Sequence, residues 1–315
     1  MIKEKYINLF TDFGFKKVFG EEANKDLLMD FLNQILPVDY TIKDLHFSKN
    51  DHLGKAVVDR KAIFDIYCIS AKDERFIVEL QKARQDYFKD RSVYYSSFPI
   101  QEMAEKGEWD FKLSPVFTIG ILNFTFKDHK EDLSTIRHHV QLKDQNCKVF
   151  YEKLHFIYLE LPKFNKQLSE CNNRYEKWLW IFKNLPNLED IPVDLKEAIF
   201  IKLFNISEVA KFGKKEREAY QQSLKYLRDM HNVVATARRE GEQIGREQSK
   251  KEIAMAKEQT KRAEDKAKEA EDKAKEAEDK AMIAMIKNTE LSDEAIANAL
   301  GVPIKRVQEL RKKMQ

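Results

Sequence analysis

The hydrophobic pattern in the first part of the chain predicts alternating helices and strands. Apolar residues recur every three or four positions over residues 25–36, and Pro37 follows, so this segment is predicted to be an amphipathic helix. Residues 63–69 and 75–81 are rich in β-branched and aromatic residues and flank the polar turn 71–74. We therefore expect these two segments to form a β-hairpin.

The pattern over about residues 84–106 predicts a further helix. The apolar segments 115–124 and 154–161 are predicted to be buried strands. This order of helix, strands, helix and strands indicates an α/β fold. From about residue 170 the pattern becomes helical, beginning with an aromatic cluster around Trp178 that is more typical of a core than of a cofactor site.

The alternation of side chains within the predicted hairpin sorts its residues onto two faces. Side chains two positions apart share a face, so Glu79 and Gln81 are expected to point the same way. A loop centred on residue 72 or 73 places Asp65 on their face, opposite one of them. The other face is then apolar and is predicted to contain Phe64, Ile66, Cys68, Phe76, Val78 and Leu80.

Two carboxylates on neighbouring strands in apolar sequence need an explanation, because each buried charge loses its hydration and the two charges repel. A divalent cation removes both problems, and an oxygen-only ligand set suits Mg²⁺ or Mn²⁺, which fits phosphodiester hydrolysis. The alternative is a solvated face on which Asp65 and Glu79 pair with lysines. The apolar Tyr67, Ile69 and Ile77 on that face favour a covered, functional site.

The sequence also resembles a known family. It is similar to the recombination-promoting nuclease or putative transposase family of the PD-(D/E)xK superfamily. The resemblance extends over about half of the chain, in the order of the family's motifs. The matching segments are Thr11-Asp-Phe-Gly-Phe-Lys-Lys-Val-Phe-Gly20, Phe64-Asp-Ile66, Val78-Glu-Leu-Gln81, Arg91-Ser-Val-Tyr-Tyr95, Pro115-Val-Phe-Thr-Ile119 and Leu159-Glu-Leu-Pro-Lys-Phe164.

The resemblance implies a restriction-endonuclease-like α/β fold, with a mixed sheet flanked by helices. It also implies that Asp65 and Glu79 hold the metal, Mg²⁺ or Mn²⁺, and that Gln81 replaces the usual catalytic lysine. Glutamine keeps the hydrogen bonding of a lysine without its charge. The expected function is a metal-dependent endonuclease acting on double-stranded DNA in recombination or transposition. The alternative is a catalytically silent relative that binds DNA or a partner.

Five further residues are candidates for contact with the metal or the nucleic acid. Asp12 is interpreted either as an additional acid near the metal or, with better support, as the N-cap of a helix. Arg91 and Tyr94 are three positions apart on a predicted helix and suit phosphate and sugar, although the same side chains could pack on the sheet. Lys82 and Arg84 follow Gln81 and are candidates for backbone contacts.

Four regions are expected along the chain: a nuclease core over 1–165, a helical extension over 166–235, a charged spacer over 236–287 and a helix-turn-helix-like tail over 288–315. The spacer repeats the unit Ala-Glu-Asp-Lys-Ala-Lys-Glu from Ala263 onward, so its alanines follow coiled-coil spacing. An alanine at a core position of a coiled coil contributes about 2 kcal/mol less stabilisation than a leucine would. A weak homodimer and a solvated single helix therefore both remain open.

The tail predicts two short helices around a glycine turn. Ser292 suits an N-cap, Gly301 the end of the first helix and Pro303 the start of the second. The tail could contact DNA or pack on itself or a second copy. The basic residues available for phosphate contact are Lys305, Arg306, Arg311 and Lys312.

Composition adds few constraints. The net charge of +3, from 56 basic and 53 acidic residues, gives no argument for a nucleic-acid partner by itself. The three cysteines lack metal-ligand spacing and are expected to be buried thiols in a reducing compartment. We found no candidate signal or membrane segment and expect a cytoplasmic protein with no membrane partner. The histidines, including the adjacent His138 and His139, are expected to be structural.

Overall fold

The computed structural model describes residues 4–48, 51–52, 62–104, 110–129 and 131–314. The chain divides into two compact units, Met1–Ala235 and Thr236–Gln315. Each unit has its own hydrophobic core.

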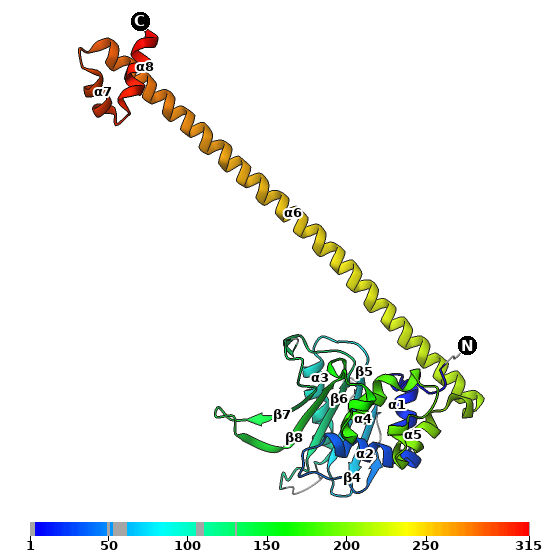
Figure 1. The fold of residues 1–315 in the computed structure, drawn as a ribbon. Helices are drawn as coiled ribbons and strands as arrows, with labels where there is room; N and C mark the ends of the chain where they lie inside the picture. The colour runs from blue at the N-terminus through cyan, green and yellow to red at the C-terminus, as the bar shows by residue number, and fades with distance from the viewer. Residues whose placement is uncertain (1–3, 49–50, 53–61, 105–109, 130, 315) are drawn as a thin grey trace. The chain divides into compact units, whose positions relative to one another are not determined.

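The first unit is built on a mixed six-stranded sheet with the order β1-β4-β5-β6-β8-β7 (Figure 1). Strands β5, β6 and β8 are parallel, and the neighbours of this parallel part, β4 and β7, run antiparallel to it. The strands are β1 (Leu45–Phe47), β4 (Ile66–Ser70), β5 (Arg75–Gln81), β6 (Val116–Leu122), β7 (Arg137–Lys143) and β8 (Val149–Glu160), beside a separate pair of β2 (Asp51–His52) and β3 (Ala62–Ile63).

The predicted hairpin forms between β4 and β5. Its register pairs Ile66 with Val78 and Tyr67 with Ile77, which centres the turn on residue 72 as expected. The two buried strands predicted after it are β6 and β8. Strand β7 was not predicted, because most of its residues are exposed and its sequence is polar.

Helices cover both faces of the sheet, as expected for a restriction-endonuclease-like fold (Figure 1). Helix α3 packs over one face, where Tyr95 and Phe98 meet Tyr67 and Ile77. The other helices of the first unit pack on the opposite face. The helices are α1 (Asp12–Phe19), α2 (Lys25–Ile35), α3 (Phe88–Glu102), α4 (Arg174–Asn184), α5 (Ala198–Ser207), α6 (Lys214–Asn288), α7 (Asp293–Leu300) and α8 (Ile304–Met314).

Two details of the hairpin region differ from the sequence prediction. Phe64 packs with Tyr67 and Ile77 under α3 instead of joining the apolar row of Ile66. The reason is a bend at Asp65, which interrupts the strand, so that strict alternation does not hold across it. In addition, α3 begins only at Phe88, directly after a residue with left-handed backbone.

The cysteines only partly fit the expectation of buried thiols. Cys68 is buried in β4, where burial raises the pKa of its thiol. Cys171 is partly exposed, and Cys147 is fully on the surface with a φ of 61° in the turn between β7 and β8. No described helix is long and apolar enough to cross a membrane.

The N-terminal motif forms a tight turn that leads into α1. Thr11, not Asp12, is the N-cap: its Oγ1 accepts a hydrogen bond from Gly14 N at 3.0 Å and donates one to Asn8 O at 2.6 Å. Asp12 occupies the first turn and pairs with Lys16 at 2.9 Å. Gly14 lies against the backbone of Asn8, so a Cβ atom there would be only 2.3 Å from Asn8 O.

The second unit holds the charged helix and the tail. Residues 231–278 of α6 are exposed, including the alanines of the repeat, so the coiled coil remains a prediction. Ser292 caps α7 and Gly301 ends it with a φ of 65°, as expected. Arg306 pairs with Glu278 and Asp279, and Arg311 pairs with Asp293, so two of the four basic residues available for phosphate contact form ion pairs within this unit. Contact of the tail with DNA remains a prediction.

We predict that Gly14→Ala lowers the free energy of unfolding of the first unit by about 1–3 kcal/mol, because the new methyl group displaces the backbone of Asn8. The matched control is Gly241→Ala, where a Cβ atom meets nothing within 4 Å. That change should be neutral or gain up to about 1 kcal/mol of helix propensity. Urea unfolding followed by tryptophan fluorescence reports the first unit, and equal stabilities of the two variants would contradict the prediction.

Candidate functional site

The two predicted acidic residues interlock at one end of the hairpin. Asp65 lies at the bend before β4, and continuing the register of β4 and β5 places it opposite Glu79. Asp65 Oδ2 accepts a hydrogen bond from Leu80 N at 2.8 Å, and Glu79 Oε1 accepts one from Asp65 N at 3.2 Å. Each carboxylate is therefore fixed by the backbone beside the other one.

Burial makes this pair electrostatically unfavourable. Burial raises the pKa of Glu79 to about 8, and the charge of Asp65 adds to this effect, while Arg91 and the backbone of Asp65 oppose it. Burial likewise raises the pKa of Asp65; the Leu80 N–H opposes the shift, and the charge of Asp12 reinforces it. The protein alone does not fully compensate these two charges, and a bound cation would.

Arg91 supplies part of the missing positive charge. Its Nη2 donates to Glu79 Oε2 at 3.2 Å and its Nη1 to Gln85 Oε1 at 2.6 Å. The guanidinium also lies over the rings of Phe88 and Tyr95, at 5.7 and 5.2 Å from their centroids. Arg91 therefore packs on the rings of α3 with its guanidinium turned towards the acidic centre, and its contact with nucleic acid remains a prediction.

Gln81 shares the face of Glu79. It is buried, and its Nε2 donates to Glu79 Oε2 at 3.4 Å. The side-chain carbonyl oxygen of Gln81 can accept a hydrogen bond from a water molecule at the same place.

A cavity of about 740 Å³ lies beside the acidic centre, between α1 and the first turns of α6. Asp12, Lys16 and Lys82 line it together with Tyr226, whose ring lies 5.2 Å from Lys82 Nζ. Asp12, Lys16 and Lys82 also influence the pKa of Asp65, which places all three charges near it. Burial lowers the pKa of Lys82.

The remaining predicted contact residues lie further out. Arg84 is exposed beside Asp86, at 3.8 Å. Tyr94 is 45% exposed and contacts Phe98 edge to face, with 5.1 Å between ring centroids. Neither residue contacts Asp65 or Glu79 in the described part of the chain, and their contact with nucleic acid remains a prediction.

The residues of the acidic centre fit a divalent cation. Asp65 and Glu79 offer carboxylate oxygens, which are the donors that Mg²⁺ and Mn²⁺ prefer. The raised pKa of both carboxylates shows that a positive charge would be favourable at this place. Gln81 adds an amide oxygen that can accept a hydrogen bond from a water ligand of the ion.

Comparison with known families agrees with this geometry. A family model described as PD-(D/E)XK nuclease family transposase matches residues 9–237, which is well over half of the chain. The chain belongs to this family. The match runs from the N-terminal turn to the first part of α6, so it includes the acidic centre and the cavity beside it. No curated protein and no solved structure matches the chain.

Membership of the PD-(D/E)XK nuclease family transposases gives the chain a role related to nuclease action and transposition. Sequence reasoning did not find Lys16 or Tyr226. Tyr226 lies 144 positions after Lys82 (226 − 82), and nothing in the local pattern of α6 distinguishes it from the other exposed aromatic residues. Only the fold brings the start of α6 to the end of β5.

We predict that Glu79→Gln stabilises the metal-free protein in EDTA by about 1 kcal/mol or more at neutral pH, because Glu79 must stay protonated in the folded protein at a pH where it ionises in the unfolded chain. The pKa of Glu79 is higher in the folded than in the unfolded state, so this gain is absent in acid and grows as the pH rises towards about 8. Urea unfolding at several pH values measures it.

Added Mn²⁺ should reverse the order, stabilising the wild type more than the variant. Glu189→Gln changes an exposed acid in the same unit and serves as the control, with stability close to that of the wild type. A Glu79→Gln protein that is less stable than the wild type in EDTA at every pH would show that Glu79 is held as a satisfied structural carboxylate.

Proposed function

We propose that this protein is a metal-dependent endonuclease that hydrolyses phosphodiester bonds of double-stranded DNA in recombination or transposition. The observation that carries the proposal is the interlocked pair of half-buried Asp65 and buried Glu79, whose pKa values are both raised. Membership of a nuclease family supports the same reaction class. In the proposed site, Asp65 and Glu79 hold Mg²⁺ or Mn²⁺.

A bound divalent ion would supply Lewis-acid stabilisation of the negative charge on the phosphate. The chain itself orients the reactants. The Leu80 N–H and the Asp65 N–H fix the two carboxylates, so little reorganisation is needed when substrate enters. Arg91 brings a cationic group to the same place and can balance charge on the phosphate.

Gln81 is proposed to orient the attacking water. Its amide nitrogen donates a hydrogen bond to Glu79. The carbonyl oxygen is then available to accept a hydrogen bond from the water. Unlike a lysine, it adds no positive charge to stabilise the phosphate. The cavity lined by Lys16, Lys82 and Tyr226 is the proposed path of the DNA backbone next to the scissile phosphate.

A plasmid-nicking assay tests the function. We expect nicking of supercoiled DNA with Mg²⁺ or Mn²⁺, none with EDTA, and a loss of at least about 10²-fold in rate for Asp65→Ala. The control is Asp39→Ala, which removes an equivalent carboxylate from an exposed position and should keep full activity. Equal nicking by the wild type and Asp65→Ala would leave the catalytically silent DNA-binding or interaction protein as the function.

The role of Gln81 has a separate test. We expect Gln81→Ala to lower the nicking rate by about 10–10²-fold while Mn²⁺ affinity, measured by calorimetry, stays the same, because Gln81 is proposed to orient water and not to bind the metal. Gln81→Lys should retain activity, since lysine can also orient the water and adds a favourable charge. Loss of Mn²⁺ binding in Gln81→Ala would assign the side chain to the metal instead.

A further inference from the structure

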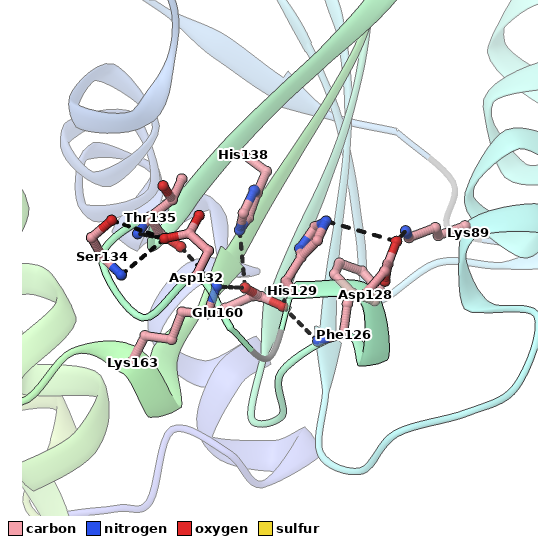
Figure 2. Close-up of polar contacts among 10 residues, drawn as sticks. All are labelled: Lys89, Phe126, Asp128, His129, Asp132, Ser134, Thr135, His138, Glu160 and Lys163. Atoms are coloured by element: carbon pink, nitrogen blue, oxygen red, sulfur yellow. Dashed lines mark hydrogen bonds and ion pairs between the residues drawn. The ribbon is translucent and has the colours of Figure 1, made fainter.

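A second cluster of ligating side chains lies away from the acidic centre, where β7 and β8 meet the short helical turn Lys127–His129 (Figure 2). It consists of His129 on that turn, His138 on β7 and Glu160 at the end of β8. One ligand atom of each residue lies within 4.8 Å of the other two. The proposed nuclease reaction uses none of these residues.

The spacing of these atoms suits a small metal ion. His138 Nε2 lies 2.9 Å from Glu160 Oε2, and His129 Nδ1 lies 3.5 Å from Glu160 Oε1. Ligands on a tetrahedral ion with bonds of about 2.0–2.1 Å lie about 3.3 Å apart, which is between these two distances, although the two distances end on different oxygens of the carboxylate. The rings of His129 and His138 stack with 4.3 Å between their centroids, and their ligand atoms lie within 4.8 Å of each other.

Neighbouring groups fix the carboxylate of Glu160. This side chain is completely buried, its Oε1 accepts from Phe126 N at 2.6 Å, and its Oε2 meets Lys163 Nζ at 2.6 Å (Figure 2). Both oxygens of Glu160 already have a polar partner, so the carboxylate can bind an ion only through a remaining lone pair, as a ligand with a single oxygen. The positive charge of Lys163 also weakens the attraction of Glu160 for a cation, so the geometry favours moderate rather than very tight binding.

His129 carries the most direct sign of a missing ligand. Its Nδ1 atom is buried and has no hydrogen-bond partner among the described residues, a condition that is unfavourable for a polar atom. Its other nitrogen, Nε2, lies 3.9 Å from Asp128 Oδ2. This separation is longer than a hydrogen bond, and the ring also packs against Phe126 and His138.

We propose that His129, His138 and Glu160 bind a Zn²⁺-class transition-metal ion, at a site separate from the acidic centre. Two imidazole nitrogens and one carboxylate oxygen are the donors that such an ion prefers, in contrast to the oxygen-only set of Asp65 and Glu79. Water completes the fourth position. The ion would tie the turn at residues 127–129 to the ends of β7 and β8.

The test uses the full chain, freed of metal with a chelator and titrated with Co²⁺ as a coloured substitute for Zn²⁺. We expect about one tetrahedral Co²⁺ per chain, displaced by Zn²⁺, and affinity lowered at least about tenfold in His129→Ala and in His138→Ala. His129→Asn keeps a polar group on the exposed side of the turn and replaces His129→Ala if that variant does not fold. Circular dichroism verifies folding of each variant.

Two matched controls identify the site. His139→Ala removes the histidine next to His138, which points to the other face and contacts His155 at 3.0 Å, and it should bind Co²⁺ as the wild type does. Asp65→Ala removes a proposed ligand of the acidic centre and can change the total Co²⁺ bound, but it should keep the tetrahedral Co²⁺ spectrum. That spectrum therefore tests this site whether or not the nuclease proposal holds. The proposal is overturned if the wild type gives no tetrahedral Co²⁺ spectrum, or if His129→Ala and His138→Ala bind as well as the wild type. The cluster is then a hydrogen-bonded network without metal.

Discussion

The close placement of half-buried Asp65 beside buried Glu79 is the interaction on which the rest of the site depends. Two carboxylates that are forced together out of water raise each other's free energy, and the shifted pKa values of both residues record this. A fold holds such a pair only where surrounding packing fixes it. Here the hairpin register and the backbone N–H groups of Asp65 and Leu80 fix both carboxylates.

The packing of the helices on the sheet stabilises the fold and offsets the destabilising effect of the two adjacent carboxylates. Tightly packed aromatic rings from α1, α2 and α4 lie over one face of the sheet, and Phe19 stacks on Phe182 with 5.6 Å between centroids. The turn of Thr11 and Gly14 fixes the start of α1, and thereby places Asp12 and Lys16 near Asp65. The N-terminal motif therefore acts on the site through backbone geometry as well as through its own charges.

The sequence predicted the structure correctly where the alternation of side chains along a strand, or the length of a turn, determined the positions of residues. The strand period of two put Glu79 and Gln81 on one face, and the turn length set the register that brings Asp65 opposite Glu79. The prediction was wrong for Phe64, because one bend at Asp65 shifts the alternation. It also misassigned the cap of α1, since Thr11 and Asp12 have similar capping ability and only the packing of Gly14 on Asn8 decides between them.

Contacts between distant segments could not be predicted in this way. Arg91 was expected to face either DNA or the sheet, and its ion pair with Glu79 requires the position of α3 over β5. Lys82 and Tyr226 meet through the packing of α6, and His129, His138 and Glu160 come from a turn and two different strands. Histidines without ligand spacing in the sequence can still converge, because spacing indicates a metal site only when one element provides several ligands.

The parallel part of the sheet explains how two chemically different centres arise in one fold. Gln81, Leu122 and Glu160 are in register at the carboxyl ends of β5, β6 and β8, so both centres lie at the same edge with β6 between them. At β5 the donors are oxygens and the nearest cations are arginine and lysine, whereas at β8 imidazole nitrogens surround a carboxylate already held by Lys163. The proposed ions differ accordingly, with a hard ion at the first centre and a transition-metal ion at the second. The carboxyl ends of the strands determine where ligating side chains come together. The chemical type of these side chains determines which ion is proposed for each centre.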